Sequence, residues 1–86
     1  MTRSDYLNAA SDLRRIANWI FRKRIEKIEL ITEILNSLAK DPEIKKTLSH
    51  FDALKDPNTE FKDTKRRIYF AEQLLVSSSC LQNKYL

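Results

Sequence analysis

Hydrophobic residues recur with the period of an α-helix along almost the whole chain. From Tyr6 to Leu38 most of them fall within one band about 140° wide on a helical wheel, with Trp19 and Leu30 outside it, and neither glycine nor proline interrupts the run. Ser4 followed by Asp5 offers an N-cap and an acidic first turn. The pattern predicts one long amphipathic helix over about residues 4–40.

Two Asp-Pro pairs divide the rest of the chain. Asp41-Pro42 and Asp56-Pro57 each combine a capping aspartate with a proline at the first helical position, which stops one helix and starts the next. They predict a short helix over about residues 42–55 and a third over about 58–82. We therefore expect an all-α, three-helix chain that forms a single helical domain over residues 1–86.

The expected helix lengths do not match. At 1.5 Å per residue the first helix would span roughly 50 Å, whereas the others would span roughly 20 and 35 Å. If each folds back along its neighbour, the first half of the long helix stays uncovered, which monomers rarely tolerate. The mismatch predicts a two-fold helical-bundle homodimer. Its face would contain Tyr6, Leu13, Ile16, Ile20 and Phe21.

Arg24 and Lys27 lie on the apolar stripe at the midpoint of this long helix. In the dimer they would mark the junction between the burial within the chain and the burial between chains. Two other layouts remain open. The second helix could act as a crossbar, so that the third covers the first half of the long helix within a monomer. Alternatively, the long helix could break near residues 22–27 and form a four-helix bundle, although no proline or glycine is present to cause the kink.

Composition excludes several classes of function. The 86 residues contain no glycine, so the glycine-rich loops of mononucleotide-binding proteins and the nucleophile elbow of α/β-hydrolases are missing. No apolar run approaches the roughly 20 residues of a membrane span. A single cysteine and an amino terminus without an apolar core indicate a soluble cytoplasmic protein. The formal net charge of +4 favours anionic partners weakly.

Aromatic and basic residues supply the candidate contact surfaces. Trp19 lies opposite the stripe, near Arg15, Arg22 and Lys23, and could contact an acidic protein or a nucleic acid. It could equally pack under a neighbouring helix or stack on its own arginines. The second basic triplet, Lys65, Arg66 and Arg67, could combine with residues 22–24 into a phosphate-binding face, or serve as ordinary solvated charge.

Catalytic and metal chemistry find little support. Glu26, Glu29 and Glu33 share one helical face without an accompanying histidine, which is typical of a solvated acidic face. His50 and Cys80 are the only residues of their types, and they could act together only if the fold brought them together with a carboxylate. We expect no metal, no cofactor and no enzymatic activity.

Two hypotheses of function follow. The first is a non-enzymatic protein-interaction or regulatory module that acts as a helical homodimer and binds an acidic partner. The alternative is a nucleic-acid-binding protein that uses the basic patches of the dimer.

Overall fold

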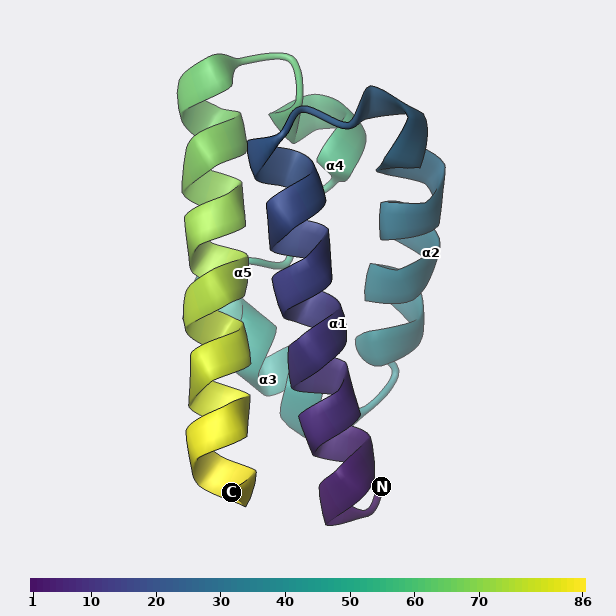
Figure 1. The fold of residues 1–86 in the computed structure, drawn as a ribbon, viewed down its shortest axis with the longest axis vertical. Helices are drawn as coiled ribbons and strands as arrows, with labels where there is room; N and C mark the ends of the chain where they lie inside the picture. Colours follow the sequence, from purple (N-terminus) through teal and green to yellow (C-terminus); the bar gives the residue numbers. More distant parts are fainter.

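The computed structural model describes all 86 residues and contains helices but no strands, which confirms the all-α prediction. The helices pack into a bundle measuring 35 × 20 × 19 Å (Figure 1). No helix is long and apolar enough to cross a membrane. In chain order the elements are α1 (Arg3–Phe21), a 3-10 turn η1 (Ile25–Lys27), α2 (Ile28–Leu38), α3 (Pro42–His50), α4 (Pro57–Glu60) and α5 (Thr64–Tyr85).

Aspartate and threonine side chains set most helix starts. The α1 N-cap is Thr2, not Ser4, and its hydroxyl and the Asp5 carboxylate form a reciprocal capping box. Asp41 accepts the backbone N–H of Ile44 at 3.1 Å, so the predicted junction before Pro42 is confirmed. Asp56 caps α4 in the same way, and Asp63 caps α5.

The predicted long helix is wrong, because the chain reverses after Phe21. The Arg24 N–H donates to the Trp19 carbonyl at 2.9 Å, and the Lys23 N–H donates to the Ile20 carbonyl at 3.1 Å. This pair of bonds is a Schellman motif, which requires a residue in the left-handed region. Lys23 takes that position with φ 54°. A lysine thus does what a glycine usually does, and the lack of glycine did not prevent the break.

The same device ends α3 earlier than the predicted residue 55. Ala53 N–H donates to the Leu48 carbonyl at 2.8 Å, with Asp52 at φ 56° between them. Ala53 and Leu48 are both buried, and such an apolar contact commonly accompanies the motif. The third predicted helix is also divided, into the four-residue α4 and the long α5.

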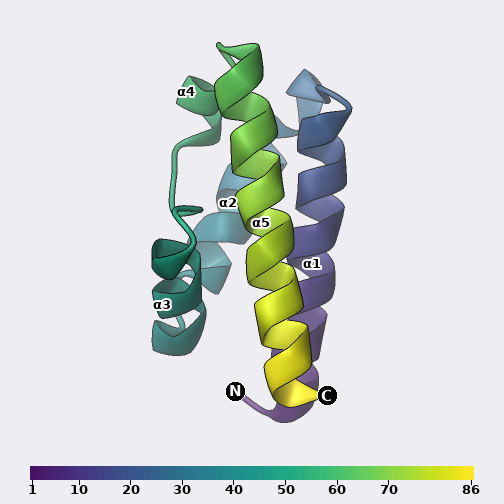
Figure 2. The same cartoon turned by 90° about the vertical axis from the view of Figure 1, so that its left-hand side faces the viewer.

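Because α1 and α2 are separate, the chain covers its own apolar stripe. α5 runs antiparallel to α1 and packs along it, as both views show (Figures 1 and 2). The two helices meet through small side chains: Ala10, Ala17, Ala71 and Ser78 are all buried, and the Ser78 hydroxyl donates to the Ala10 carbonyl at 2.6 Å. The fold therefore combines the two alternatives of a broken first helix and a last helix that covers its first half.

This packing corrects the predicted dimer face. Leu13, Ile16 and Ile20 are 0% exposed within a single chain, so they are not available to a second copy. Tyr6 and Phe21 are half-buried and pack against the same core. The length mismatch that motivated the homodimer does not exist in the folded chain.

Candidate interaction surface

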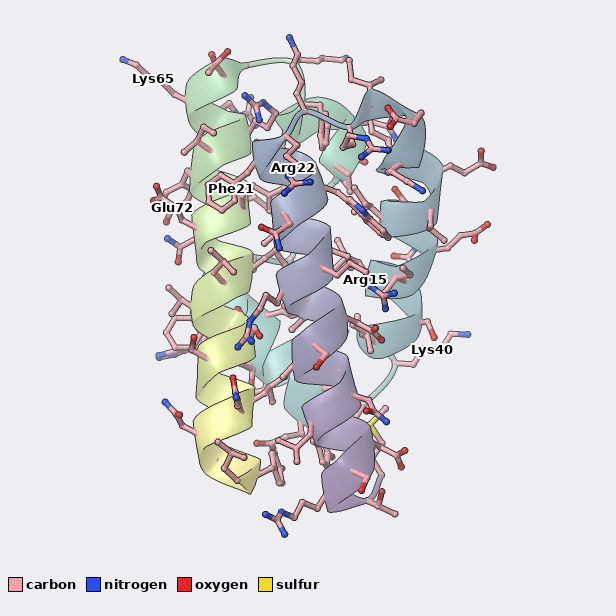
Figure 3. All side chains as sticks on the ribbon, in the orientation of Figure 1. Arg15, Phe21, Arg22, Lys40, Lys65 and Glu72 are labelled. Atoms are coloured by element: carbon pink, nitrogen blue, oxygen red, sulfur yellow. The ribbon has the colours of Figure 1, made fainter.

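The fold brings the two basic triplets to one end of the bundle. The turn after α1 carries Arg22, Lys23 and Arg24, and the first turn of α5 carries the second triplet. Both turns lie at the upper end in Figure 1, where α1 finishes beside the start of α5. In Figure 3, Arg22 and Lys65 extend from these neighbouring helices. We call this region, residues 22–25 and 62–66, the basic end.

Arg67 is the member of the second triplet that holds the two helices together. Its Nη1 donates to the Ile20 carbonyl at 2.5 Å and to the Phe21 carbonyl at 3.1 Å, and the residue is only 7% exposed. A guanidinium here satisfies the last carbonyls of α1 and interacts favourably with its dipole. The prediction that Arg67 contacts a partner is therefore wrong, because its side chain is buried as a C-terminal cap of α1.

The remaining cations of the basic end differ in whether they have a carboxylate partner. Arg24 pairs with Glu26, and this hydrogen bond lowers the pKa of the Glu26 carboxyl. Arg66 pairs with the buried Glu60 at 3.0 Å. The exposed residues without an ion pair are Arg22, Lys23, Lys62 and Lys65. These four cations are free to meet a negatively charged partner.

An exposed isoleucine lies at the edge of this charged region. Ile25 follows directly after the first triplet and is 56% exposed, one of the most exposed large apolar residues in the chain. Sequence reasoning missed it, because Ile25 lies outside the stripe on which the helix prediction depended. The sequence did contain a signal for an exposed contact, namely an isoleucine outside the stripe that directly follows three basic residues. It gives the basic end a short apolar contact in addition to its charge.

Trp19 is less accessible than the sequence analysis predicted. It is half-buried and packs against the core. Lys27 Nζ lies 5.1 Å and the Arg15 guanidinium carbon 5.8 Å from the centre of its ring. Arg15 also forms an ion pair with Asp12. The structure therefore matches the alternative in which Trp19 packs beneath its neighbours and stacks on cations.

Tyr6 lies at the opposite end of the molecule and belongs to a different cluster. Its ring stacks on Tyr85 at 4.3 Å between ring centres, and its hydroxyl donates to Asp41 at 3.3 Å. Burial, the hydrogen bond to Asp41 and nearby negative charge raise the pKa of Tyr6 to about 12. Tyr6 thus joins the first and last helices to the α2–α3 junction.

His50 and Cys80 line the same hollow between α3 and α5, together with Glu43. This is the convergence that the sequence alone could not establish. No hydrogen bond joins the Cys80 thiol to the His50 imidazole, and the Glu43 carboxylate is paired with Lys84. The imidazole instead meets the ring of Phe51 edge-on at 4.8 Å. The three groups share a hollow without forming the hydrogen-bonded chain of a nucleophile, base and orienting acid.

No group of three or more histidine, cysteine, aspartate or glutamate residues is arranged to hold a metal ion. Comparisons of this chain with protein-family models, curated proteins and solved structures found no match.

Proposed function

We propose that this protein is a non-enzymatic interaction module that binds an acidic segment of a partner protein through its basic end. The observation that carries the proposal is the meeting of two basic turns, far apart in sequence, with four exposed cations that have no carboxylate partner. Clustered charge of one sign raises the local concentration of opposite charge and speeds association.

The exposed side chain of Ile25 favours a protein over a nucleic acid as the partner. An apolar contact surrounded by charge is typical of protein interfaces, in which a small buried anchor supplies much of the binding energy. Non-specific binding of single strands uses aromatic platforms. Three members of the two triplets already have contacts within the chain. Arg24 pairs with Glu26, Arg66 pairs with Glu60, and Arg67 donates to the end of α1. These contacts leave fewer cations for phosphates than the nucleic-acid hypothesis assumed.

Fluorescence anisotropy with two probes tests this function. One probe is a labelled amphipathic Leu/Glu peptide of about 14 residues, and the other is a labelled DNA duplex of similar charge. We expect the peptide to bind and the double variant Arg22→Glu, Lys65→Glu to weaken it by about tenfold or more. The double variant Lys45→Glu, Lys46→Glu, on α3 away from the basic end, is the matched control because it changes the net charge by the same amount, and it should change binding less than about twofold.

Either of two results would contradict the proposal. Equal losses for the basic-end double variant and for Lys45→Glu, Lys46→Glu would mean that net charge alone attracts the probe. Tighter binding of the duplex, falling steeply with added salt, would favour the nucleic-acid alternative instead.

The proposal does not require the predicted homodimer. The stripe that was expected to form the dimer face is inside the chain, so a monomer already buries it. Sedimentation equilibrium at high micromolar concentration should therefore report the mass of one chain, 10.2 kDa. A stable dimer would have to use another face of the molecule, and variants of the basic end would show whether that face is shared.

A further inference from the structure

Two adjoining hollows lie along α2. One hollow of about 370 Å³ lies between α2 and residues 53–57, which connect α3 to α4. A second, more open hollow continues it past Thr32 toward Ile25 and the start of α2. Both hollows include Thr32 in their walls, so they adjoin each other along α2, and together we call them the α2 groove. α2 has 11 residues and is about 16 Å long, enough for a partner helix of two to three turns.

The α2 groove has apolar side chains at both ends. Ile25 and Ile28 line one hollow, and Leu35 and Leu54 line the other. Ile25 is 56% exposed and Leu54 is 47% exposed, so each presents apolar surface that nothing in the chain covers. Covering such surface is favourable by about 25 cal/mol per Å². The apolar face of an amphipathic helix packs against exposed apolar side chains of this kind in a groove.

Carboxylates surround this apolar surface. Glu26, Glu29 and Glu33 line the hollow on the α2 side, and Asp56 lines the other from the opposite wall. Neither Glu29 nor Glu33 forms an ion pair, although both are exposed. Like charges four residues apart on a helix repel and destabilise it slightly. A cation placed between these two carboxylates would relieve that repulsion.

The one cation of the groove does not neutralise it. Lys55 pairs with Asp52 at 3.2 Å and lies 4.0 Å from the Glu60 carboxylate, and its ammonium group sits 5.0 Å from the centre of the Tyr69 ring. Those contacts hold its charge toward α5. The groove is therefore acidic, although the net charge of the protein is +4. It favours a cationic partner, whereas the basic end favours an anionic one.

We propose that the α2 groove binds a basic amphipathic helix of a second protein. Its apolar residues would lie against Ile25 and Leu54, and its lysines or arginines would meet Glu29 and Glu33. Phosphate-rich partners are disfavoured here by charge. A second copy of this chain in the same two-fold orientation would place carboxylates against carboxylates, which costs free energy. The groove thus gives the module a second binding site, which adjoins the basic end at Ile25 and binds a partner of opposite charge.

Binding of a labelled amphipathic Leu/Lys peptide of about 14 residues tests this inference by fluorescence anisotropy. We expect the charge-reversing double variant Glu29→Lys, Glu33→Lys to weaken binding by about tenfold or more. Leu54→Asp should weaken it as well, because loss of the apolar contact outweighs the attraction of the added carboxylate for the peptide. Glu72→Lys is the matched control for Glu33→Lys alone, since each reverses one charge and Glu72 is exposed on the face of α5 turned away from α2 (Figure 3). It should change affinity less than about twofold.

Amide shifts in ¹H–¹⁵N spectra of the wild-type protein locate the bound peptide independently of the variants. Support requires the largest shifts at Thr32, Leu35 and Leu54. Shifts centred elsewhere, no binding at high micromolar peptide, or equal weakening by Glu72→Lys would overturn the proposal. So would a dimer that Leu54→Asp dissociates without peptide, because the groove would then hold a second copy. Arg22→Glu with Lys65→Glu leaves the groove residues unchanged, so failure of the basic end can be distinguished from failure of the groove.

Discussion

The α1–α5 pair and the α2 side of the bundle differ in how completely they are closed. Along α1 and α5 the contacts are between alanines, serines and large aliphatic residues that are almost fully buried, and α5 covers α1 over most of its length. On the opposite side of α1 lies the shorter α2 (Figure 1), beside residues 53–57. Apolar residues of α2 and of the turn before it, such as Leu30 and Ile25, are exposed. The first region supplies stability, and the second supplies accessible surface.

The largest expected difference between these regions is in the free energy of unfolding after leucine truncation. Leu13→Ala in α1 should lower it by about 2 to 5 kcal/mol, because a fully buried leucine leaves a cavity between α1 and α5. Leu30→Ala in α2, where the side chain is 39% exposed, should cost less than about 1 kcal/mol. Urea denaturation followed by circular dichroism measures both, and similar losses would contradict the comparison.

The next largest effect is expected at the upper end of the α1–α5 pair, where the Arg67 side chain caps α1. Arg67→Ala should lower the free energy of unfolding by about 2 kcal/mol, because the carbonyls of Ile20 and Phe21 lose their donor and a buried side chain is removed. Lys65→Ala, two residues away and exposed without an ion pair, should change it by less than about 0.5 kcal/mol. Thermal and urea unfolding of both variants test this, and a neutral Arg67→Ala would show that the cap contributes little.

A smaller, stabilising effect is expected in the turn after α1, which connects the α1–α5 pair to the α2 side of the bundle. Lys23→Gly should raise the free energy of unfolding by about 1 kcal/mol, because glycine adopts φ 54° without the steric penalty of a β-carbon. Asp52→Gly, at φ 56° in the other Schellman turn, should gain less because aspartate tolerates this region better. Urea denaturation checks this expectation, because the midpoint should rise more for Lys23→Gly than for Asp52→Gly. A lower midpoint for Lys23→Gly would contradict it.

The smallest expected effect is on the pH dependence of the free energy of unfolding, and it arises from Tyr6 at the lower end of the bundle. The pKa of Tyr6 is raised from 10.0 to about 12 in the folded protein, so the folded state holds this proton more firmly than the unfolded chain. That contribution to stability is complete below about pH 10 and is lost as the pH rises through about 12. Tyr6→Phe should therefore make stability fall less steeply over this window than Tyr69→Phe, a change on the exposed face of α5. Identical slopes would contradict the assignment.

Local signals in the sequence predicted helix starts better than helix ends. The Asp41-Pro42 and Asp56-Pro57 junctions could be read directly, because a capping aspartate and a proline at the first helical position act within a few residues. The breaks after Phe21 and His50 could not be read, because lysine and aspartate are not the usual residues of a Schellman turn. Their left-handed conformations are accepted because burial and hydrogen bonds elsewhere outweigh a cost of about 1 to 2 kcal/mol each.

The candidate surfaces could likewise be predicted only in part from the sequence. The sequence indicated two basic triplets and an acidic face at Glu26, Glu29 and Glu33, but not which cations were free or what the glutamates faced. Burial of Arg67 against the end of α1 and the pairing of Arg66 with Glu60 depend on residues brought together by the reversal. The hollow that those glutamates line has Asn58 of α4 in its wall, so it depends on the contact between α2 and α4.

Taken alone, the sequence determined the helical class, the positions of the Asp-Pro junctions and the identity of most core residues, because periodicity, capping and apolar character are local properties. Tertiary structure decided that the first helix would break, that α5 would cover it, and that the basic turns would share one end. Those outcomes depend on which arrangement buries Leu13, Ile16 and Ile20 most completely for the whole chain. That free energy is summed over contacts between residues far apart in sequence, so no single segment encodes it.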